Sequence, residues 1–330
     1  MRYKWTSAFV ALTLCSAVLV MAADKIQIVE WDVPTPHSLP HDPAVGSDGA
    51  LWYTGIEANV IGRLDPATGK IKEYHLKTDD SGPHGLVGDR EGNIWFTANY
   101  KGYIGKLEPK TGEITQFPLP DPSARDPHSI VFDKKGSIWF TVQNGNFIGQ
   151  LDPATGKIML TPLPVPHSKP YGIAVDSLGI PFFCEFGANK LASIDPGTYK
   201  ITEYFLPEGA RPRRLAITTA DIVYYTDYAR GYLGRMDIRN GKIEEWPSPG
   251  GTGSKPYGIT ATQDGTIWYS ESGINPNTIV RFSPQTHSFK TWRVPSGGKV
   301  IRNMAATPNG NIYFASSGAN KIGIIRVEEK

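Results

Sequence analysis

Seven equivalent positions of a repeated sequence pattern carry side chains that can do chemistry, and none of the seven is apolar. Each follows a recurrent proline or stands where such a residue would: His41, His84, His128, Tyr171, Arg213, Tyr257 and Arg302. Neutral imidazole is suited to proton abstraction near neutral pH, and a guanidinium can hold a carboxylate or stabilise a developing enolate. The set therefore indicates a ligand site. The structural alternative is that Pro-His is a repeat signature whose imidazole bonds a neighbouring backbone carbonyl.

A second set of equivalent positions follows the aromatic stretch of each repeat and carries three acids. They are Glu185, Asp227 and Glu271, in the fourth, fifth and sixth repeats. A polar ring of mixed charge is the default place for a ligand. We expect the acids to bind substrate together with four residues of the first set, His41, Tyr171, Arg213 and Arg302. For any single acid, an ion pair with a structural arginine is the simpler explanation.

Both sets recur because the chain repeats about every 43 residues. A turn glycine or its substitute stands at Gly49, Gly92, Gly136, Gly179, Asp221, Gly265 and Gly310, between 42 and 45 residues apart. In residues 82–120, three Gly-bounded stretches rich in β-branched and aromatic residues precede a fourth that alternates polar and apolar. Four strands per repeat of this length are typical of one propeller blade. The sequence predicts an all-β, seven-bladed β-propeller of four-stranded antiparallel blades.

The ends of the chain complete this prediction. The seventh repeat stops one strand short, at Val327, and residues 25–33 resemble the fourth strands of other repeats. We expect this N-terminal strand to complete the last blade and remove the exposed edges of an open ring. In a propeller, the first strand of each blade lines the central channel, so the first set of side chains should surround one channel mouth.

The first 23 residues have a basic start, an apolar run and small residues at the end, which is typical of a secretory signal peptide. We expect a single domain over residues 24–330, exported to the periplasm or the extracellular space; a retained anchor helix is the alternative. The remaining cysteine, Cys184, is expected to be a core residue. A formal net charge of +2 argues against a nucleic-acid or membrane partner. We expect a monomer with a small-molecule, oligosaccharide or peptide ligand.

The repeat pattern Pro-His-Gly…Gly-x-Ile-Trp-Phe-Thr…Ile-Gly…Gly-x-Ile-x-x-(aromatic)-x-Leu-Pro, as it stands in residues 82–120, resembles the virginiamycin B lyase (streptogramin lyase) family over about residues 25–327. The resemblance implies a seven-bladed propeller. It also implies a lyase that opens an ester-linked cyclic peptide by elimination with Mg²⁺. The family's site has a histidine in the sixth blade, a Glu-Pro-His in the seventh and a glutamate after the seventh aromatic strand.

At these family positions the chain has Tyr257, Val300, Arg302 and Ser317, so the resemblance supports the fold more than the reaction. A rotated site is one hypothesis, because blades two and three hold His84, Asp126 and His128, with Gln143 nearby. Turning the ring by its pseudo-symmetry places these residues on the family's positions. Such a set would bind a divalent metal, and its ligand types favour Zn²⁺ or Mn²⁺ over Mg²⁺.

Two classes of function follow from the sequence. In the first, the protein is a C–O lyase for an ester-linked cyclic peptide or a uronate-type substrate. Its catalytic residues would be His84, His128, Asp126 and Tyr257, with a tentative metal site at His84, Asp126 and His128. In the second, the same mouth is a non-catalytic binding module for an anionic ligand or a protein. A sugar-lactone hydrolase of the six-bladed type is disfavoured by the seven repeats.

Overall fold

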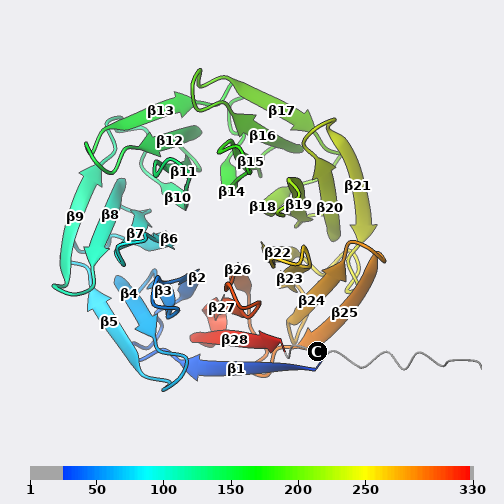
Figure 1. Ribbon diagram of the computed structural model, residues 1–330, viewed down its shortest axis with the longest axis horizontal. Coiled ribbons are helices and arrows are strands. Elements are labelled where there is room, and N and C mark those ends of the chain that lie inside the picture. The colour runs from blue at the N-terminus through cyan, green and yellow to red at the C-terminus, as the bar shows by residue number, and fades with distance from the viewer. Residues whose placement is uncertain (1–24, 328–330) are drawn as a thin grey trace, which may run out of the picture.

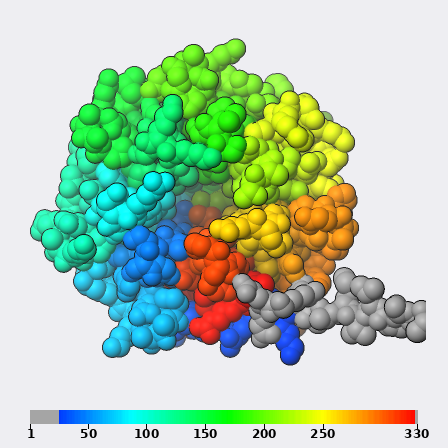
Figure 2. Space-filling view, in the orientation of Figure 1, coloured from blue at the N-terminus to red at the C-terminus, as the bar shows by residue number. Residues whose placement is uncertain are grey.

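The computed structural model describes residues 25–327, which form seven four-stranded antiparallel sheets around a central axis (Figure 1). The predicted seven-bladed propeller is therefore confirmed. The ring leaves a hollow at the centre of the face shown in Figure 2. The signal peptide predicted over residues 1–23 lies outside the described residues. Within residues 25–327, no helix has the length and apolar character needed to cross a membrane.

Each blade contributes one strand to each of four concentric positions. The innermost strands are β2 (Pro40–Val45), β6 (Pro83–Gly88), β10 (Pro127–Phe132), β14 (Pro170–Val175), β18 (Pro212–Ile217), β22 (Pro256–Ala261) and β26 (Ile301–Ala306). The second strands are β3 (Leu51–Gly55), β7 (Ile94–Ala98), β11 (Ile138–Val142), β15 (Pro181–Glu185), β19 (Ile222–Asp227), β23 (Ile267–Glu271) and β27 (Ile312–Ser316).

The third strands are β4 (Val60–Leu64), β8 (Tyr103–Glu108), β12 (Phe147–Leu151), β16 (Lys190–Ile194), β20 (Tyr232–Asp237), β24 (Thr278–Ser283) and β28 (Lys321–Val327). The outer strands are β5 (Ile71–His75), β9 (Glu113–Pro118), β13 (Ile158–Pro162), β17 (Ile201–Phe205), β21 (Lys242–Pro247), β25 (Ser288–Arg293) and β1 (Ile26–Asp32). A single 3₁₀ turn, η1 (Ser317–Ala319), precedes β28 among the described residues.

The N-terminal strand closes the ring as expected. β1 pairs antiparallel with β28, from Ile26 opposite Val327 to Asp32 opposite Lys321, so the last blade takes its outer strand from the start of the chain. Figure 1 shows the blue and red strands side by side in that blade. This closure ties first blade to last and leaves the ring without an open end.

The turn that joins the first and second strands of each blade requires a positive φ angle. The angle is +77° at Gly49, and the only non-glycine at this position, Asp221, has φ of +56°. L-residues rarely adopt this conformation, although aspartate tolerates it better than most, so the recurrent glycine is explained by backbone geometry.

Within most blades, an aromatic side chain of the second strand packs over a small residue of the third strand. Phe140 is fully buried, and it lies over Gly149 of the third strand. A Cβ atom at Gly149 would lie only 2.1 Å from Cζ of Phe140, so the ring occupies the space that a side chain would need. The Trp-aromatic-Thr and Ile-Gly motifs of the sequence are therefore the two sides of one packing contact.

The threonine of the same motif connects neighbouring blades. Oγ1 of Thr141 accepts a hydrogen bond from the Ser129 amide at 3.1 Å and donates one to the Tyr171 carbonyl of the next blade at 2.8 Å. Thr54, Thr97 and Thr226 make the same pair of bonds. Because each bond reaches the start of an innermost strand, these buried threonines set the position of the side chains at the channel mouth. Cys184 takes this place in blade four and is buried, as expected of a core residue.

We predict that Thr141→Val lowers the free energy of unfolding by about 1–3 kcal/mol, because the amide of Ser129 and the carbonyl of Tyr171 lose a buried partner. Urea denaturation measures the change. Thr115→Val, at an exposed position of β9, is the matched control, and we expect it to alter stability by less than about 0.5 kcal/mol. Equal stability of the two variants would contradict the role assigned to Thr141.

Candidate functional site

Three imidazoles and a phenol ring form a continuous row on one side of the channel. The ring centroids of His41 and His84 are 3.8 Å apart, those of His84 and His128 are 3.7 Å apart, and those of His128 and Tyr171 are 3.9 Å apart. These four residues come from four consecutive blades and are almost completely buried against one another. The sequence placed them at equivalent repeat positions, and the fold brings them into direct contact.

The other side of the mouth is built around Arg213. The guanidinium carbon of Arg213 lies 4.0 Å from the ring centre of Tyr257, 4.3 Å from that of Tyr228, 4.9 Å from that of Phe186 and 5.0 Å from that of Tyr171. The hydroxyl groups of Tyr171 and Tyr257 also hydrogen-bond each other. Four aromatic rings therefore hold the arginine through cation–π contacts, and no carboxylate among the described residues pairs with it.

A buried ion pair crosses the channel next to the histidines. Nη2 of Arg214, on β18, donates to Oδ1 of Asp42, on β2, at 2.7 Å. The same Oδ1 is 2.9 Å from Nδ1 of His41, and Oδ2 accepts a hydrogen bond from the side-chain Nδ2 of Asn303 at 3.1 Å. Nη1 of Arg214 is 3.3 Å from Oγ of Ser129. Side chains from blades one, three, five and seven therefore meet in one polar network.

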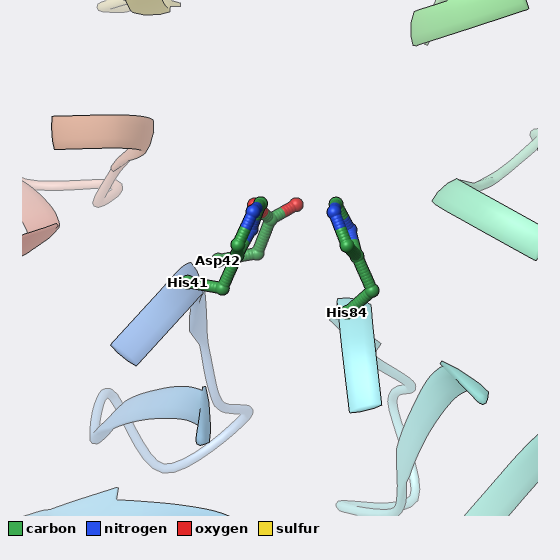
Figure 3. Close-up of side chains that lie close together, drawn as sticks. All are labelled: His41, Asp42 and His84. Atoms are coloured by element: carbon green, nitrogen blue, oxygen red, sulfur yellow. The ribbon is translucent and has the colours of Figure 1, made fainter. Parts of the chain in front are cut away.

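A bulge explains why adjacent residues can both face the channel. Side chains of a regular strand alternate between faces, but the pairing of β2 with β3 shifts register between Pro40 and Pro43. Figure 3 shows the result: His41 and Asp42 lie side by side, and His84 faces them from β6. Because a carboxylate only accepts hydrogen bonds, Nδ1 of His41 carries the proton and Nε2 keeps its lone pair.

A cavity of about 250 Å³ lies on the other side of this network. Asp42, Ser129, Arg214 and Asn303 line it at one end, and aliphatic residues such as Leu86 and Ile173 line its walls. No histidine of the row lines it. The ion pair therefore separates the imidazole row from the rest of the channel.

The three histidines are held in their neutral form. Burial lowers the pKa of His41, His84 and His128 well below the usual value. The charge of Arg302 lowers the pKa of His41 further, and Arg214 acts in the same direction on all three. Each histidine therefore offers a lone pair at neutral pH, although a weakly basic one.

The three acids named from the sequence are buried behind the mouth. Asp227 accepts hydrogen bonds from the Arg211 amide at 3.0 Å and from the Arg230 side chain. Glu271 accepts from Ser248, Gly250 and Thr278 at 2.5 to 2.6 Å. Glu185 is fully buried, and burial raises its pKa to about 7. Asp227 and Glu271 thus hydrogen-bond to loops at the ends of their strands. None of the three acids presents accessible surface to a ligand.

Asp126 lies at the start of blade three and is held by its own blade. Its carboxylate accepts hydrogen bonds from the amide and side chain of Asn144 and from the Gly145 amide, at 2.6 to 3.1 Å. It is therefore engaged in a loop contact, whereas His128, two residues later, bonds Ser129 Oγ at 3.1 Å. The structure brings His84 and His128 together without placing Asp126 between them.

The positions where the family holds its metal offer no metal ligand set here. Tyr257 bonds Tyr171, and Nε of Arg302 donates to Oγ of Ser317 at 3.1 Å. A guanidinium and two hydroxyls at these places do not suit Mg²⁺, which prefers carboxylate and water oxygens. A different group, His41, Asp42 and His84, has ligand atoms within 4.8 Å of one another and could hold a metal. That group contains one residue of the tentative metal site, His84.

Several residues of the site were not singled out from the sequence. Asp42 and Arg214 are the strongest examples, since they are 172 residues apart and only the closed ring brings them together. Phe186 and Tyr228 also escaped notice, although both directly follow an acid of the second set. The sequence signal for them was an aromatic residue directly after the acid, because this order recurs in blades four and five.

Comparison with known proteins agrees with the architecture. The sequence profile of the virginiamycin B lyase family matches residues 19–187 and 182–330. A solved structure described as a streptogramin B lyase is 30% identical over 92% of this chain and 98% of that chain, with a TM-score of 0.84. No curated protein matches the sequence.

Two further solved structures are of virginiamycin B lyase from Staphylococcus aureus, one with selenomethionine and one a catalytically inactive variant with quinupristin. Each is 27% identical, covers 92% of this chain and all of its own, and has a TM-score of 0.84. A hydrazine synthase from Kuenenia stuttgartiensis is only 14% identical with a TM-score of 0.73, so it supports the fold alone.

The neutral histidines predict a stability that falls on acidification. Unfolded histidine takes up a proton below about pH 6.5, whereas these three stay neutral in the fold, so the unfolded state binds more protons as the pH drops. Each such group costs up to about 1.4 kcal/mol per pH unit below that value. His84→Gln should therefore lose less stability than the wild type between pH 7 and pH 5.

Urea denaturation at the two pH values measures this difference. The raised pKa of Glu185 acts in the opposite direction, because its ionisation is disfavoured in the fold, but it is common to both proteins and cancels. His75→Gln, at the exposed end of β5, controls for loss of a histidine as such. An identical pH dependence in His84→Gln and the wild type would show that His84 is not held neutral.

Proposed function

The chain belongs to the virginiamycin B lyase family, and from that premise we propose that its channel mouth binds the carboxylate of a small ligand through Arg213 and Arg302. The observation that supports this most is that neither arginine forms an ion pair with a carboxylate of the described residues. Both lie close enough to His41 for their charge to lower its pKa. A charge-assisted bond from arginine to a ligand carboxylate would complete the site.

The setting of Arg213 favours binding. Its four aromatic neighbours hold the guanidinium in place, so little conformational freedom is lost when a ligand binds. Phe186 and Tyr228 are only partly buried and leave apolar surface beside the charge. A ligand that carries a carboxylate next to an apolar or ring-shaped body, such as a uronate-type sugar, matches this combination.

Three more cations surround the same side of the mouth, and we call them the basic rim: Lys169, Arg211 and Lys255. Each directly precedes the proline that opens an innermost strand, in blades four, five and six. Their carbonyls accept hydrogen bonds from the amides of Phe186, Tyr228 and Ser272. The equivalent residues of blades one to three are Leu39, Gly82 and Asp126. The positive charge is therefore concentrated on one half of the mouth, which favours an anionic ligand there.

A second candidate is elimination at a C–O bond of the bound ligand, and the His41–Asp42 contact favours it. Asp42 fixes the tautomer of His41, and no described residue hydrogen-bonds Nε2 of that ring. Nε2 would take the proton α to the ligand's carbonyl, and Arg302 would stabilise the enolate. The electron pair would then form the C=C bond as the β C–O bond breaks, and the leaving oxygen would take a proton from the imidazolium.

We further propose that the protein is exported after loss of residues 1–23 and acts as a monomer. An extracytoplasmic location would give the mouth access to acidic sugars and peptides.

Arginine-to-glutamine variants test the binding proposal. We expect Arg213→Gln and Arg302→Gln each to weaken binding of galacturonate by about 10- to 100-fold, the effect of losing a hydrogen bond to a charged group. Titration calorimetry gives the affinities, with galactose as the neutral ligand. Arg90→Gln, at an exposed turn on the opposite face, is the matched control. Affinities equal to those of Arg90→Gln would overturn the assignment of Arg213 and Arg302.

The elimination step has its own test. Wild-type protein incubated with an ester-linked or uronate-type substrate should produce an unsaturated product, detected by its ultraviolet absorbance and by mass spectrometry. His41→Gln should abolish turnover and change the affinity for galacturonate much less. Binding without product in the wild type would leave the binding module as the function and exclude the lyase for the substrates tried.

A further inference from the structure

We propose that the guanidinium of Arg214 takes the place of a metal ion in this channel, and that removing it would turn His41, Asp42 and His84 into a transition-metal site. The native protein would therefore bind no metal at these residues. The inference does not depend on the proposed carboxylate binding, because Arg214 and Asp42 lie beneath the mouth rather than in it.

The carboxylate of Asp42 is already occupied on both oxygens. Oδ1 lies 2.7 Å from Nη2 of Arg214 and 2.9 Å from Nδ1 of His41, and Oδ2 accepts from Asn303 at 3.1 Å. The side chains of Arg214 and Asp42 are 5% and 4% exposed. A metal ion bound to this carboxylate would therefore have to displace the buried guanidinium.

The charge of Arg214 also disfavours a metal ion at this carboxylate. Arg214 already neutralises the charge of Asp42 in the buried ion pair. A divalent cation would add two positive charges close to Arg214 in a buried place, where like charges repel strongly.

Without Arg214 the same residues would form a suitable donor set. Asp42 would be a buried carboxylate with an uncompensated charge, and the ligand atoms of His41, Asp42 and His84 already lie within 4.8 Å of one another. Nδ1 of His84 is buried and has no hydrogen-bond partner among the described residues. Two imidazoles and one carboxylate are ligands typical of Zn²⁺ and Co²⁺ rather than Mg²⁺.

The experiment compares four proteins: wild type, His84→Ala, Arg214→Leu and the double variant Arg214→Leu/His84→Ala. Each is titrated with Zn²⁺ by calorimetry and with Co²⁺ by visible spectroscopy. We expect Arg214→Leu to bind one equivalent of metal at least 100-fold more tightly than the double variant, with the intense visible bands of tetrahedral Co²⁺. The wild type and His84→Ala should behave alike, because any remaining surface sites are common to both.

Two results would overturn the proposal. One is stoichiometric metal binding by the wild type that His84→Ala abolishes, which would show that Arg214 does not exclude the ion. The other is a folded Arg214→Leu that binds metal no better than the double variant. Arg214→Gln serves if Arg214→Leu does not fold, and a rise in its unfolding temperature with Zn²⁺ that is absent in Arg214→Gln/His84→Ala would support the proposal.

Discussion

The ion pair between Arg214 and Asp42 joins blades one and five across the axis of the ring, and the arrangement of the mouth depends on it. A buried pair of this kind is costly to break, because either partner alone would be an unpaired charge away from water. While it is intact, Asp42 orients His41, and Arg214 helps to keep the histidine row neutral. One contact therefore sets position, charge and protonation for side chains from several blades.

The backbone at the start of the innermost strands also positions the side chains of the mouth. A register shift interrupts strand pairing at the start of each innermost strand, and in blade one it brings two successive side chains, His41 and Asp42, to the axis. In that blade, the threonine of the second strand bonds to the bulged segment. Because the same threonine also reaches the next blade, the position of each mouth residue is linked to that of its neighbour. The outer closure by β1 completes this chain of contacts around the ring.

The family resemblance informs the fold, whereas the polar residues of the mouth inform the function. A TM-score of 0.84 at 27 to 30% identity shows that this chain shares the architecture of the family's solved structures. The mouth is where this chain departs from the pattern of its family, with a basic and aromatic half on blades four to seven and an imidazole half on blades one to three. A propeller tolerates such changes because the aromatic second strands and the turns, which the mouth residues do not form, specify the blades.

The sequence by itself determined the architecture and the identity of the ring residues. Period, turn glycines and aromatic strands depend on local backbone conformation and nearest-neighbour packing, and both are written into each repeat, as are the proline-linked positions from His41 to Arg302. The partners of those residues were decided only by the tertiary structure. Asp42 and Arg214 belong to different repeats with no local signal for their pairing, and Asp126 turns to its own loop instead of the histidines. Contacts across a closed ring depend on how all the blades are placed together, so one repeat cannot specify them.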